Sequence, residues 1–417
     1  MLLMTIPYPG IMGGRLVSYT LFLCLMGMIA IFTTCCSNDN ASVATASPGG
    51  IENEVASTFP QVNGPVFAMV SDGVNGVYLG GRFTRVGTMD RPYLAHIKED
   101  GTVDPSWNPI PDGPVTALLV QNQAVYVGGS FLNMNSEERW RLAAVDRETG
   151  LLTEWNPRLG TANLVDVLAS SGPVIYVGGV FELVNAAIIP GTGLRGEGRR
   201  NLAAVDTGTG LATPWNPNVP NGEVMALSIV GSVVYAGGSF DQVGVVGQDV
   251  IRFDLAAFDQ GSGVATPWNP TVRGIDGDII SALDLSGNVV YVGGRFRQIG
   301  GQARDNLAAL DMESGLATNW NFPTNDAVST FFDDGQRLYI GGLFTTIGGQ
   351  PRGRLAAIDK TTRLLTPWNP NANGMVRTIV ASNGKVFVGG DFTTIGGRPR
   401  NMFAVIDAET GFLLGSD

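Results

Sequence analysis

The sequence has little of the side-chain chemistry that metal sites and most enzymes need. Among its 417 residues the only cysteines are Cys24, Cys35 and Cys36, and the only histidine is His96. Beyond residue 36 the chain therefore cannot form a disulfide, a thiolate metal site or a cysteine nucleophile. A single histidine also excludes multi-histidine metal sites and most acid–base mechanisms that use several imidazoles. We expect no cofactor, no metal and no catalytic residue.

Charged residues are also scarce, and acidic ones predominate. They make up 15% of the chain, and the formal net charge is −11 at pH 7. An acidic surface repels phosphate backbones and anionic lipid headgroups. We therefore expect no nucleic-acid partner, and contact with a membrane only through the N-terminus.

The N-terminus has the plan of a secretory signal. Arg15 precedes the apolar run Leu16–Phe32, and small residues follow it. The ending Thr33-Thr34-Cys35-Cys36 resembles a bacterial lipoprotein signal, and this resemblance implies lipidation at Cys35 or Cys36. Cleavage without lipidation and a retained anchor remain alternatives. We predict a signal over residues 1–36, a flexible tether over 37–54, and an extracytoplasmic protein that is secreted or is an outer-membrane or cell-surface lipoprotein.

The remainder of the chain, residues 55–417, repeats one pattern seven times. In each repeat an apolar strand ends in Gly-Gly, and a phenylalanine follows two residues later. The second glycines of these pairs are Gly81, Gly129, Gly179, Gly238, Gly294, Gly342 and Gly390. Downstream come a Leu-Ala-Ala-x-Asp strand, as at Leu142–Asp146, and a segment ending in Trp-Asn-Pro, as at Trp155.

Four short strands repeated seven times indicate an all-β, seven-bladed β-propeller with four antiparallel strands per blade. The repeats begin near residues 62, 113, 163, 222, 278, 326 and 374. We expect Gly-Gly to provide either positive φ or close backbone approach. Asp-x-x-Thr-Gly, as at Asp146, predicts a hairpin turn. The recurring tryptophans predict packing between blades; sugar-stacking platforms are the alternative function.

The two ends of the array differ from the other repeats. The last repeat stops at Asp417 before its Trp-Asn-Pro, whereas Phe59-Pro60 precedes the first repeat close to where that motif stands elsewhere. A ring must join its ends to remove exposed strand edges. We hypothesise that residues 54–60 form or complete the outer strand of the seventh blade.

At these motifs the chain resembles the bacterial delta-60 repeat propellers. The first repeat, Leu94–Pro109, carries the resemblance most clearly, and more distantly the chain is similar to kelch, galactose-oxidase-like and Rax-type propellers. The resemblance implies the fold and an extracellular setting, and says little about function. The copper chemistry of galactose oxidase needs one cysteine and two histidines, so it cannot be carried over.

Departures from the repeat indicate where a function could be located. The spacing from the phenylalanine to Leu-Ala-Ala is 11 positions in five repeats, but 21 from Phe181 to Leu202 and 15 from Phe240 to Leu255. The link from Trp268 to Ile280 is also long. In a four-stranded blade all three expansions emerge on one face, over blades three to five. Tolerated insertion is the alternative to a grafted function. The predicted binding residues are Trp140, Arg195, Arg199, Arg200, Arg252, Arg273, Asp276 and Asp278.

The sequence favours a non-enzymatic extracytoplasmic scaffold that binds a protein or other ligand through this loop face. The alternative is a carbohydrate-active enzyme or lectin of the cell envelope, which needs carboxylates about 5–10 Å apart in the central funnel. The expected partner is an unidentified protein or glycan, and the expected state is a monomer. His96 is predicted to be a packed residue, and Asp276-Gly-Asp278 alone is a weak calcium motif.

Overall fold

The computed structural model describes residues 59–160, 164–190, 193–244, 250–274 and 277–415. All of these lie in one compact unit, Glu54–Asp417. The predicted signal, the tether, and Cys35 and Cys36 lie outside the described residues. Every regular element in the described part is a strand. In this part of the chain, no helix has the length and apolar composition needed to span a membrane.

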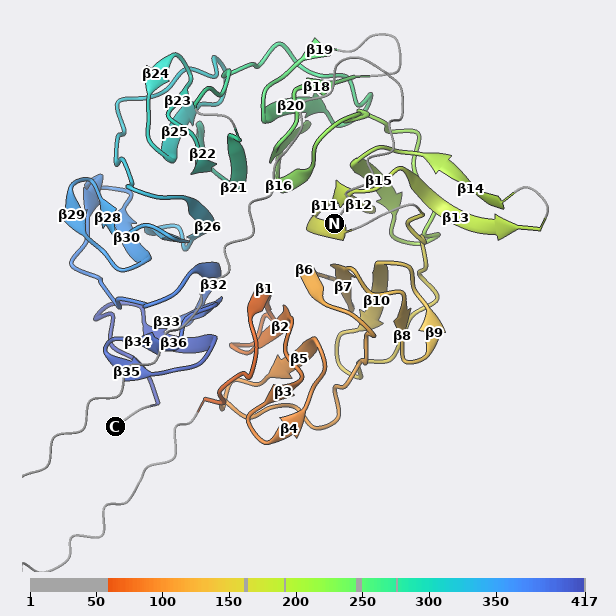
Figure 1. Cartoon of the computed structure of the whole chain (residues 1–417), viewed down its shortest axis with the longest axis horizontal. Helices are drawn as coiled ribbons and strands as arrows, with labels where there is room; N and C mark the ends of the chain where they lie inside the picture. Colours follow the sequence, from red (N-terminus) through yellow and green to blue (C-terminus); the bar gives the residue numbers. More distant parts are fainter. Residues whose placement is uncertain (1–58, 161–163, 191–192, 245–249, 275–276, 416–417) are drawn as a thin grey trace, which may run out of the picture. The chain divides into compact units, whose positions relative to one another are not determined.

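Seven antiparallel sheets follow one another around a ring (Figure 1). Their innermost strands are β1 (Val66–Ser71), β6 (Val115–Gln121), β11 (Leu164–Ser171), β16 (Val224–Val230), β21 (Ile279–Ser286), β26 (Val328–Asp333) and β32 (Val376–Ser382). The central strands are β2 (Val77–Gly81), β7 (Ala124–Gly129), β12 (Val174–Val180), β17 (Val233–Gly238), β22 (Val289–Arg295), β27 (Arg337–Gly342) and β33 (Lys385–Gly390). The third strands are β5 (Leu94–Ile97), β10 (Leu142–Asp146), β15 (Leu202–Asp206), β20 (Leu255–Asp259), β25 (Leu307–Asp311), β30 (Leu355–Asp359) and β36 (Phe403–Asp407). The fold is the predicted seven-bladed β-propeller.

The fourth strand of each blade is shorter than the sequence suggested. It is a single bridge in six blades, for example Val145↔Leu152 and Ile406↔Leu413. Only in blade six does it form a short strand, β31 (Leu364–Leu365). Trp-Asn-Pro follows the Asp-x-x-Thr-Gly turn after only a few residues. Its proline has no N–H to donate to a strand ladder, so the fourth strand stays short.

Each blade also has a hairpin of two strands between its second and third strands. These hairpins are β3 (Arg85–Val86) with β4 (Met89–Asp90), β8 (Asn133–Met134) with β9 (Glu137–Glu138), β13 (Leu183–Ile189) with β14 (Gly193–Gly198), β18 (Gln242–Val243) with β19 (Val250–Ile251), β23 (Gln298–Ile299) with β24 (Gln302–Ala303), β28 (Thr346–Ile347) with β29 (Gln350–Pro351), and β34 (Thr394–Ile395) with β35 (Arg398–Pro399). In Figure 1 they lie at the outer part of their blades.

Each hairpin pairs with the link that enters its own blade. The bridges Gly160↔Leu183 and Arg273↔Gln298 are two examples. The described parts of the blade-three hairpin, of the blade-four hairpin and of the link into blade five therefore lie on one face, which we call the hairpin face.

Close approach explains the Gly-Gly pair. A β-carbon on Gly128 would come within 2.5 Å of Val165 in the next blade, and one on Gly129 would come within 2.2 Å of the Pro114 carbonyl oxygen. Each innermost strand also has a bulge beside the pair, as between Val165 and Val167. Any side chain at these glycines would separate strands or blades.

The recurring tryptophans pack between blades, as predicted. Trp215 is 4% exposed and meets Tyr176 of its own blade edge to face, with ring centroids 5.0 Å apart. Its indole N–H donates to the carbonyl of Asp259 in the next blade at 3.0 Å. That aspartate begins the predicted turn, in which its side chain accepts the backbone N–H and hydroxyl of Ser262. The same bond to the turn of the following blade is made by Trp107, Trp155, Trp268 and Trp368.

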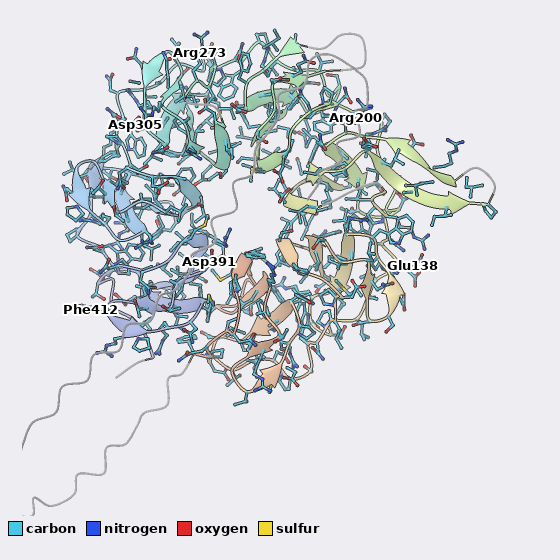
Figure 2. The ribbon with its side chains drawn as sticks, viewed as in Figure 1. Glu138, Arg200, Arg273, Asp305, Asp391 and Phe412 are labelled. Atoms are coloured by element: carbon cyan, nitrogen blue, oxygen red, sulfur yellow. The ribbon has the colours of Figure 1, made fainter. Side chains whose placement is uncertain are left out.

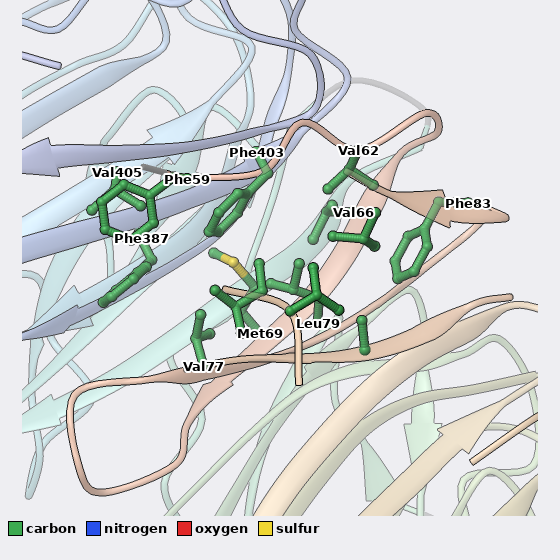
Figure 3. Packing of buried hydrophobic residues seen from close by; sticks show 14 of the residues in the cluster. Phe59, Val62, Val66, Met69, Val77, Leu79, Phe83, Phe387, Phe403 and Val405 are labelled. Carbon is green, nitrogen blue, oxygen red and sulfur yellow. The ribbon is translucent and has the colours of Figure 1, made fainter. Parts of the chain in front are cut away.

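Phe59 takes the place of the missing seventh tryptophan. It is 7% exposed and packs edge to face on Phe387, at the position where the other blades have tyrosine. Figure 3 shows Phe59 beside Phe387 and Phe403 of blade seven, in a cluster that also contains Val66 and Leu79 of blade one. The first described residues therefore close the ring between the seventh and first blades.

The hypothesis that residues 54–60 provide the outer strand of blade seven needs correction. Leu413 makes the bridge to Ile406, so blade seven supplies its own outer segment. Phe59 contributes a packed ring, and Val62 pairs with Val86 of blade one. Residues 54–58 lie outside the described part. Within the described residues, the ring of Phe59 and the pairing of Val62 with Val86 join the two ends.

Replacing Phe59 by alanine is expected to lower the free energy of unfolding by about 1.5–3 kcal/mol, because a buried aromatic side chain is lost at the closure. Urea unfolding of the full chain measures this. The matched control is Phe412→Ala, since Phe412 is 74% exposed and its loss should leave the urea midpoint almost unchanged. Equal effects of the two substitutions would contradict the closure described here.

Candidate functional site

An arginine stands three residues before the third strand in all seven blades. These residues are Arg91, Arg139, Arg199, Arg252, Arg304, Arg352 and Arg400. In each, one terminal guanidinium nitrogen donates to the preceding residue's carbonyl. The other donates to the segment after the Asp-x-x-Thr-Gly turn, as from Arg199 to the Thr213 carbonyl at 2.7 Å. The arginine thus ties the end of each hairpin to its own blade's outer segment.

Two predicted binding residues, Arg199 and Arg252, belong to this framework set. Arg252 donates to the carbonyls of Ile251 and Thr266, and burial lowers its pKa. The side chain of Arg199 is only 11% exposed. The guanidinium N–H groups of both residues bond carbonyls of their own blade, so neither arginine is counted among the candidate binding residues. Counting back three positions from Leu-Ala-Ala would have revealed the set in the sequence.

The residue directly before each third strand has left-handed backbone. Examples are Asn201, Asp254 and Asn306, with φ of 61°, 61° and 64°. Asn201 and Asn306 use this geometry to donate from the side-chain amide to the carbonyls of Val219 and Thr324, both at 2.8 Å. Asparagine adopts this conformation more readily than most residues.

Asp254 stands where blades three and five have asparagine, and it lacks the amide donor. Burial raises the pKa of Asp254 to about 7, and the negative charges of Asp278 and Asp241 add to the shift. Protonation gives the carboxyl a donor in place of the missing amide. Asp278, one of the predicted binding residues, therefore lies close to Asp254 at the junction of blades four and five.

Between the framework arginine and the left-handed residue lies one position whose side chain varies. Its backbone carbonyl accepts the N–H of the outgoing link, as between Arg200 and Val219 at 3.1 Å. Its side chain contributes nothing to that bond and is free to differ between blades. In blades two to five this position holds Trp140, Arg200, Phe253 and Asp305, which we call the variable row.

The variable row combines aromatic and charged groups at equivalent places in four consecutive blades. Arg200, Phe253 and Asp305 are exposed, Phe253 to 43%. Trp140 is half-buried, with the Arg158 guanidinium 5.9 Å from its ring centroid. Figure 2 shows the side chains of Arg200 and Asp305 on their blades. Phe253 was missed in the sequence because it lies between two polar residues.

A cavity lies next to the last member of the row. Its volume is about 480 Å³, and its lining includes Asp278, Arg295, Arg297, Asp305 and Asp326. Arginine and aspartate together suit a ligand or partner segment that carries both charges. Phe296 and Thr324 close its floor, both almost fully buried.

The other predicted site residues are dispersed. Arg273 lines a separate cavity of about 370 Å³ beside Gly300 and Leu316. Arg195 is exposed on β14. Asp276, the first residue of the Asp276-Gly-Asp278 motif, lies outside the described residues. The structure therefore brings Arg200 into the row with Trp140, and Asp278 to its edge.

The comparisons with known proteins agree with this architecture. A family model described as "Domain of unknown function (DUF5122) beta-propeller" matches residues 75–106 and 381–404, in the first and last blades. The first and last blades are therefore similar to DUF5122 β-propeller repeats. The predicted likeness to delta-60 repeat propellers is confirmed. No curated protein matches closely enough to count as a relative.

The solved structures that are similar to this chain support its fold, but not a function. The WD40 β-propeller domain of Doa1 is 12% identical with a TM-score of 0.52, and the match covers 80% of this chain and 93% of that one. A chain of the mitotic checkpoint complex is also 12% identical, with a TM-score of 0.53 and coverage of 86% and 96%. At this identity no activity or partner can be transferred.

Two acidic side chains, from blades three and four, lie near each other beside the innermost strands. Asp166 lies at the bulge of β11, and its carboxyl interacts with that of Glu223 just before β16. Burial raises the pKa of Asp166 to about 8, and the hydrogen bond and charge of Glu223 add to this. At neutral pH the protonated Asp166 can share its proton with Glu223.

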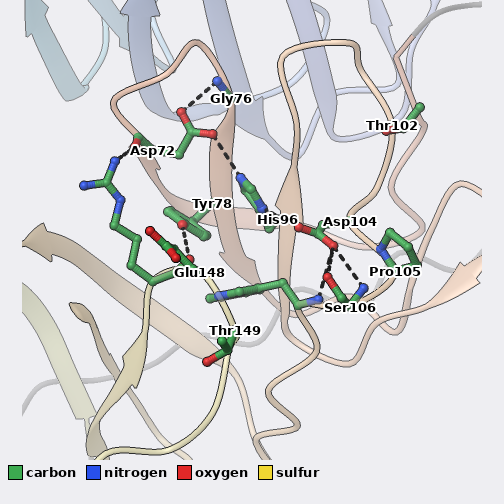
Figure 4. A network of polar contacts seen from close by, with 12 residues as sticks. Asp72, Gly76, Tyr78, His96, Thr102, Asp104, Pro105, Ser106, Glu148 and Thr149 are labelled. Carbon is green, nitrogen blue, oxygen red and sulfur yellow. Dashed lines mark hydrogen bonds and ion pairs between the residues drawn. The ribbon is translucent and has the colours of Figure 1, made fainter. Parts of the chain in front are cut away.

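His96 is packed within the first DUF5122 blade, as predicted. Its Nε2 lies 3.0 Å from an oxygen of Asp72 and its Nδ1 3.2 Å from one of Asp104, while Tyr78 stacks on its ring (Figure 4). Burial favours a higher pKa for Asp72, but hydrogen bonds from His96 and backbone N–H groups outweigh it and lower that pKa. Within the described residues no group of three His, Cys, Asp or Glu side chains could hold a metal ion.

Proposed function

We propose that this propeller is a non-enzymatic, extracytoplasmic scaffold that binds a protein partner through the hairpin face over blades three to five, with Trp140 of blade two at its edge. One observation carries the proposal. Four consecutive blades hold Trp140, Arg200, Phe253 and Asp305 at one outward position, although the residues on either side serve the framework. Tryptophan and arginine are common anchors of protein interfaces.

The surroundings of the variable row support binding. The insertions of blades three to five lie on the same face, and the mixed-charge cavity adjoins Asp305. Loops on a rigid scaffold are where recognition is usually located.

The test compares the full chain with a row variant in which Trp140, Arg200, Phe253 and Asp305 are all alanine. Each immobilised protein is incubated with an envelope extract, and retained proteins are identified by mass spectrometry. We expect at least one protein to be retained by the parent and lost from the row variant. Melting curves should overlap, because the framework bonds at this position use backbone atoms.

The matched control changes four exposed apolar residues at the turns before the outer segments of the same blades. Leu151, Leu211, Val264 and Leu316 are 57–65% exposed, and their replacement by alanine should leave retention intact. Equal retention by parent and row variant would refute the proposal. Retention of glycans in place of proteins, measured on a glycan array, would support the lectin alternative.

A further inference from the structure

The hairpin of blade three differs from the other six in that it forms a ribbon. β13 and β14 span seven and six residues, whereas strands in the other hairpins have two. Figure 1 shows the ribbon extending outward beyond the outline of its neighbours. Its base is anchored, because Leu183 pairs with Gly160 and Ala186 is buried.

The outer edge of β14 is paired with no other described strand, although the Gly198 carbonyl at its end accepts side-chain donors from Arg199 and Asn216. β13 and β14 form a two-stranded sheet, and no other described strand joins it. All residues of β14 except Leu194 are exposed. Three of the six are glycine, and a β-carbon on Gly193 or Gly198 would meet nothing within 4 Å. An accessible edge without bulky side chains can accept a further strand.

The charges on β14 are arranged so that the strand can pair with itself. Arg195 and Glu197 stand on either side of Gly196, and residues two apart point to the same face of a strand. When two copies of β14 run antiparallel about Gly196, Arg195 lies opposite Glu197 of the second copy, and Glu197 lies opposite its Arg195. Such opposite-charge pairs stabilise a sheet.

Other registers lose this match. Centring the pair on Arg195 or on Glu197 places like charges directly opposite, which destabilises a sheet. A shift of one residue places each charge opposite glycine or leucine and onto the other face. The bulge of the ribbon is in β13, between Val184 and Ala187. Side chains along β14 therefore alternate regularly between the two faces, as this register requires.

Pairing with a second copy would also place another strand beside β14. Two-stranded ribbons are marginally stable in water, and additional strands stabilise them. Ile188 is 71% exposed and Ile189 is 45% exposed on β13. In the sheet made by two ribbons the strand order is β13-β14-β14-β13, so β14 becomes a central strand while these isoleucines stay on the outer strands.

We propose that β14 is a self-association edge through which two copies of this chain join in an antiparallel, two-fold symmetric sheet. The partner is a second copy because the Arg195-Gly196-Glu197 sequence is complementary to itself. This differs from the monomer expected from the sequence. It uses the ribbon and none of the variable row, so it goes beyond the proposed function and does not depend on it.

The experiment is sedimentation velocity on the full chain over a range of protein concentrations at low and high salt. We expect a monomer–dimer equilibrium that weakens as salt rises. R195E and E197R should each weaken association by about tenfold or more, because two attractive pairs become repulsive. The charge swap R195E/E197R should restore dimerisation. The matched control, R200E, changes a nearby exposed arginine outside β14 and should have little effect.

Each result bears directly on the proposal. A parent protein that stays monomeric at low salt overturns it, as does a dimer that R195E leaves intact. A charge swap that fails to restore association excludes this register. Melting curves of all variants separate loss of association from loss of folding. Specific capture of a different protein on the β14 edge, with no dimer of the parent, assigns the edge to another partner and also overturns the proposal.

Discussion

Trp215→Ala is expected to lower the free energy of unfolding by about 3–5 kcal/mol, the range for truncating a buried tryptophan. The indole is 4% exposed and contacts Tyr176 and Phe258 in adjoining blades. Truncation removes these contacts, leaves a cavity between blades three and four, and frees the carbonyl of Asp259 that the indole N–H bonds. Urea unfolding followed by circular dichroism measures the change.

The same substitution at Trp140 is the control. Trp140 is half-buried, and its framework contact is its backbone carbonyl, which accepts the N–H of Leu159. Trp140→Ala should therefore change the unfolding free energy by about 1 kcal/mol or less while reducing partner retention. If Trp215→Ala unfolds at the parent midpoint, the inter-blade role of the repeated tryptophan is wrong.

Asp166→Asn is expected to make the protein more stable at pH 8–9 by a few kcal/mol. The pKa of Asp166 in the folded chain is about 8, against 3.8 for an ordinary aspartate, because burial and Glu223 disfavour the charged form. Below pH 4 both folded and unfolded chains hold the proton. Between pH 4 and 8 the folded chain keeps a proton that the unfolded chain has released, so stability falls as pH rises. Asparagine removes this loss, and its amide can donate to Glu223.

Unfolding free energies measured from pH 4 to pH 9 give the readout. The Asp166→Asn profile should fall less over this range than that of the parent, and the two curves should separate progressively up to pH 8. Glu154→Gln, which removes an exposed carboxylate, should follow the parent profile. Parallel profiles for Asp166→Asn and the parent would show that the carboxyl pair does not titrate across this window.

Much of the fold could be predicted from the sequence because each blade is encoded by short local patterns. The apolar strand before Gly-Gly recurs seven times, the tryptophan six times and Leu-Ala-Ala-x-Asp five times. Each motif forms a strand or turn within its own repeat, and counting motifs counts blades. The positions of the expansions on one face followed from strand order alone.

The candidate site could be predicted only in part. Arg199 and Arg200 looked equivalent as neighbouring arginines in an expanded loop, yet Arg199 bonds the Thr213 carbonyl and Arg200 is exposed. Phe253 did not stand out until its position was compared with Trp140 in three dimensions. The closure by Phe59 was expected as a strand and is a packed ring.

The sequence by itself determined the seven blades, their strand order and the face on which the chain expands. Only the tertiary structure decided which groups the recurring arginines bond, which carboxyls are buried and which side chains are exposed. The physical reason is that the framework arginines bond backbone carbonyls, as Arg252 bonds Thr266 14 residues away. Every residue has such a carbonyl, so no side-chain pattern marks the one that is used. Burial likewise arises only when the blades meet, and that sets the pKa of Asp166 and Asp254.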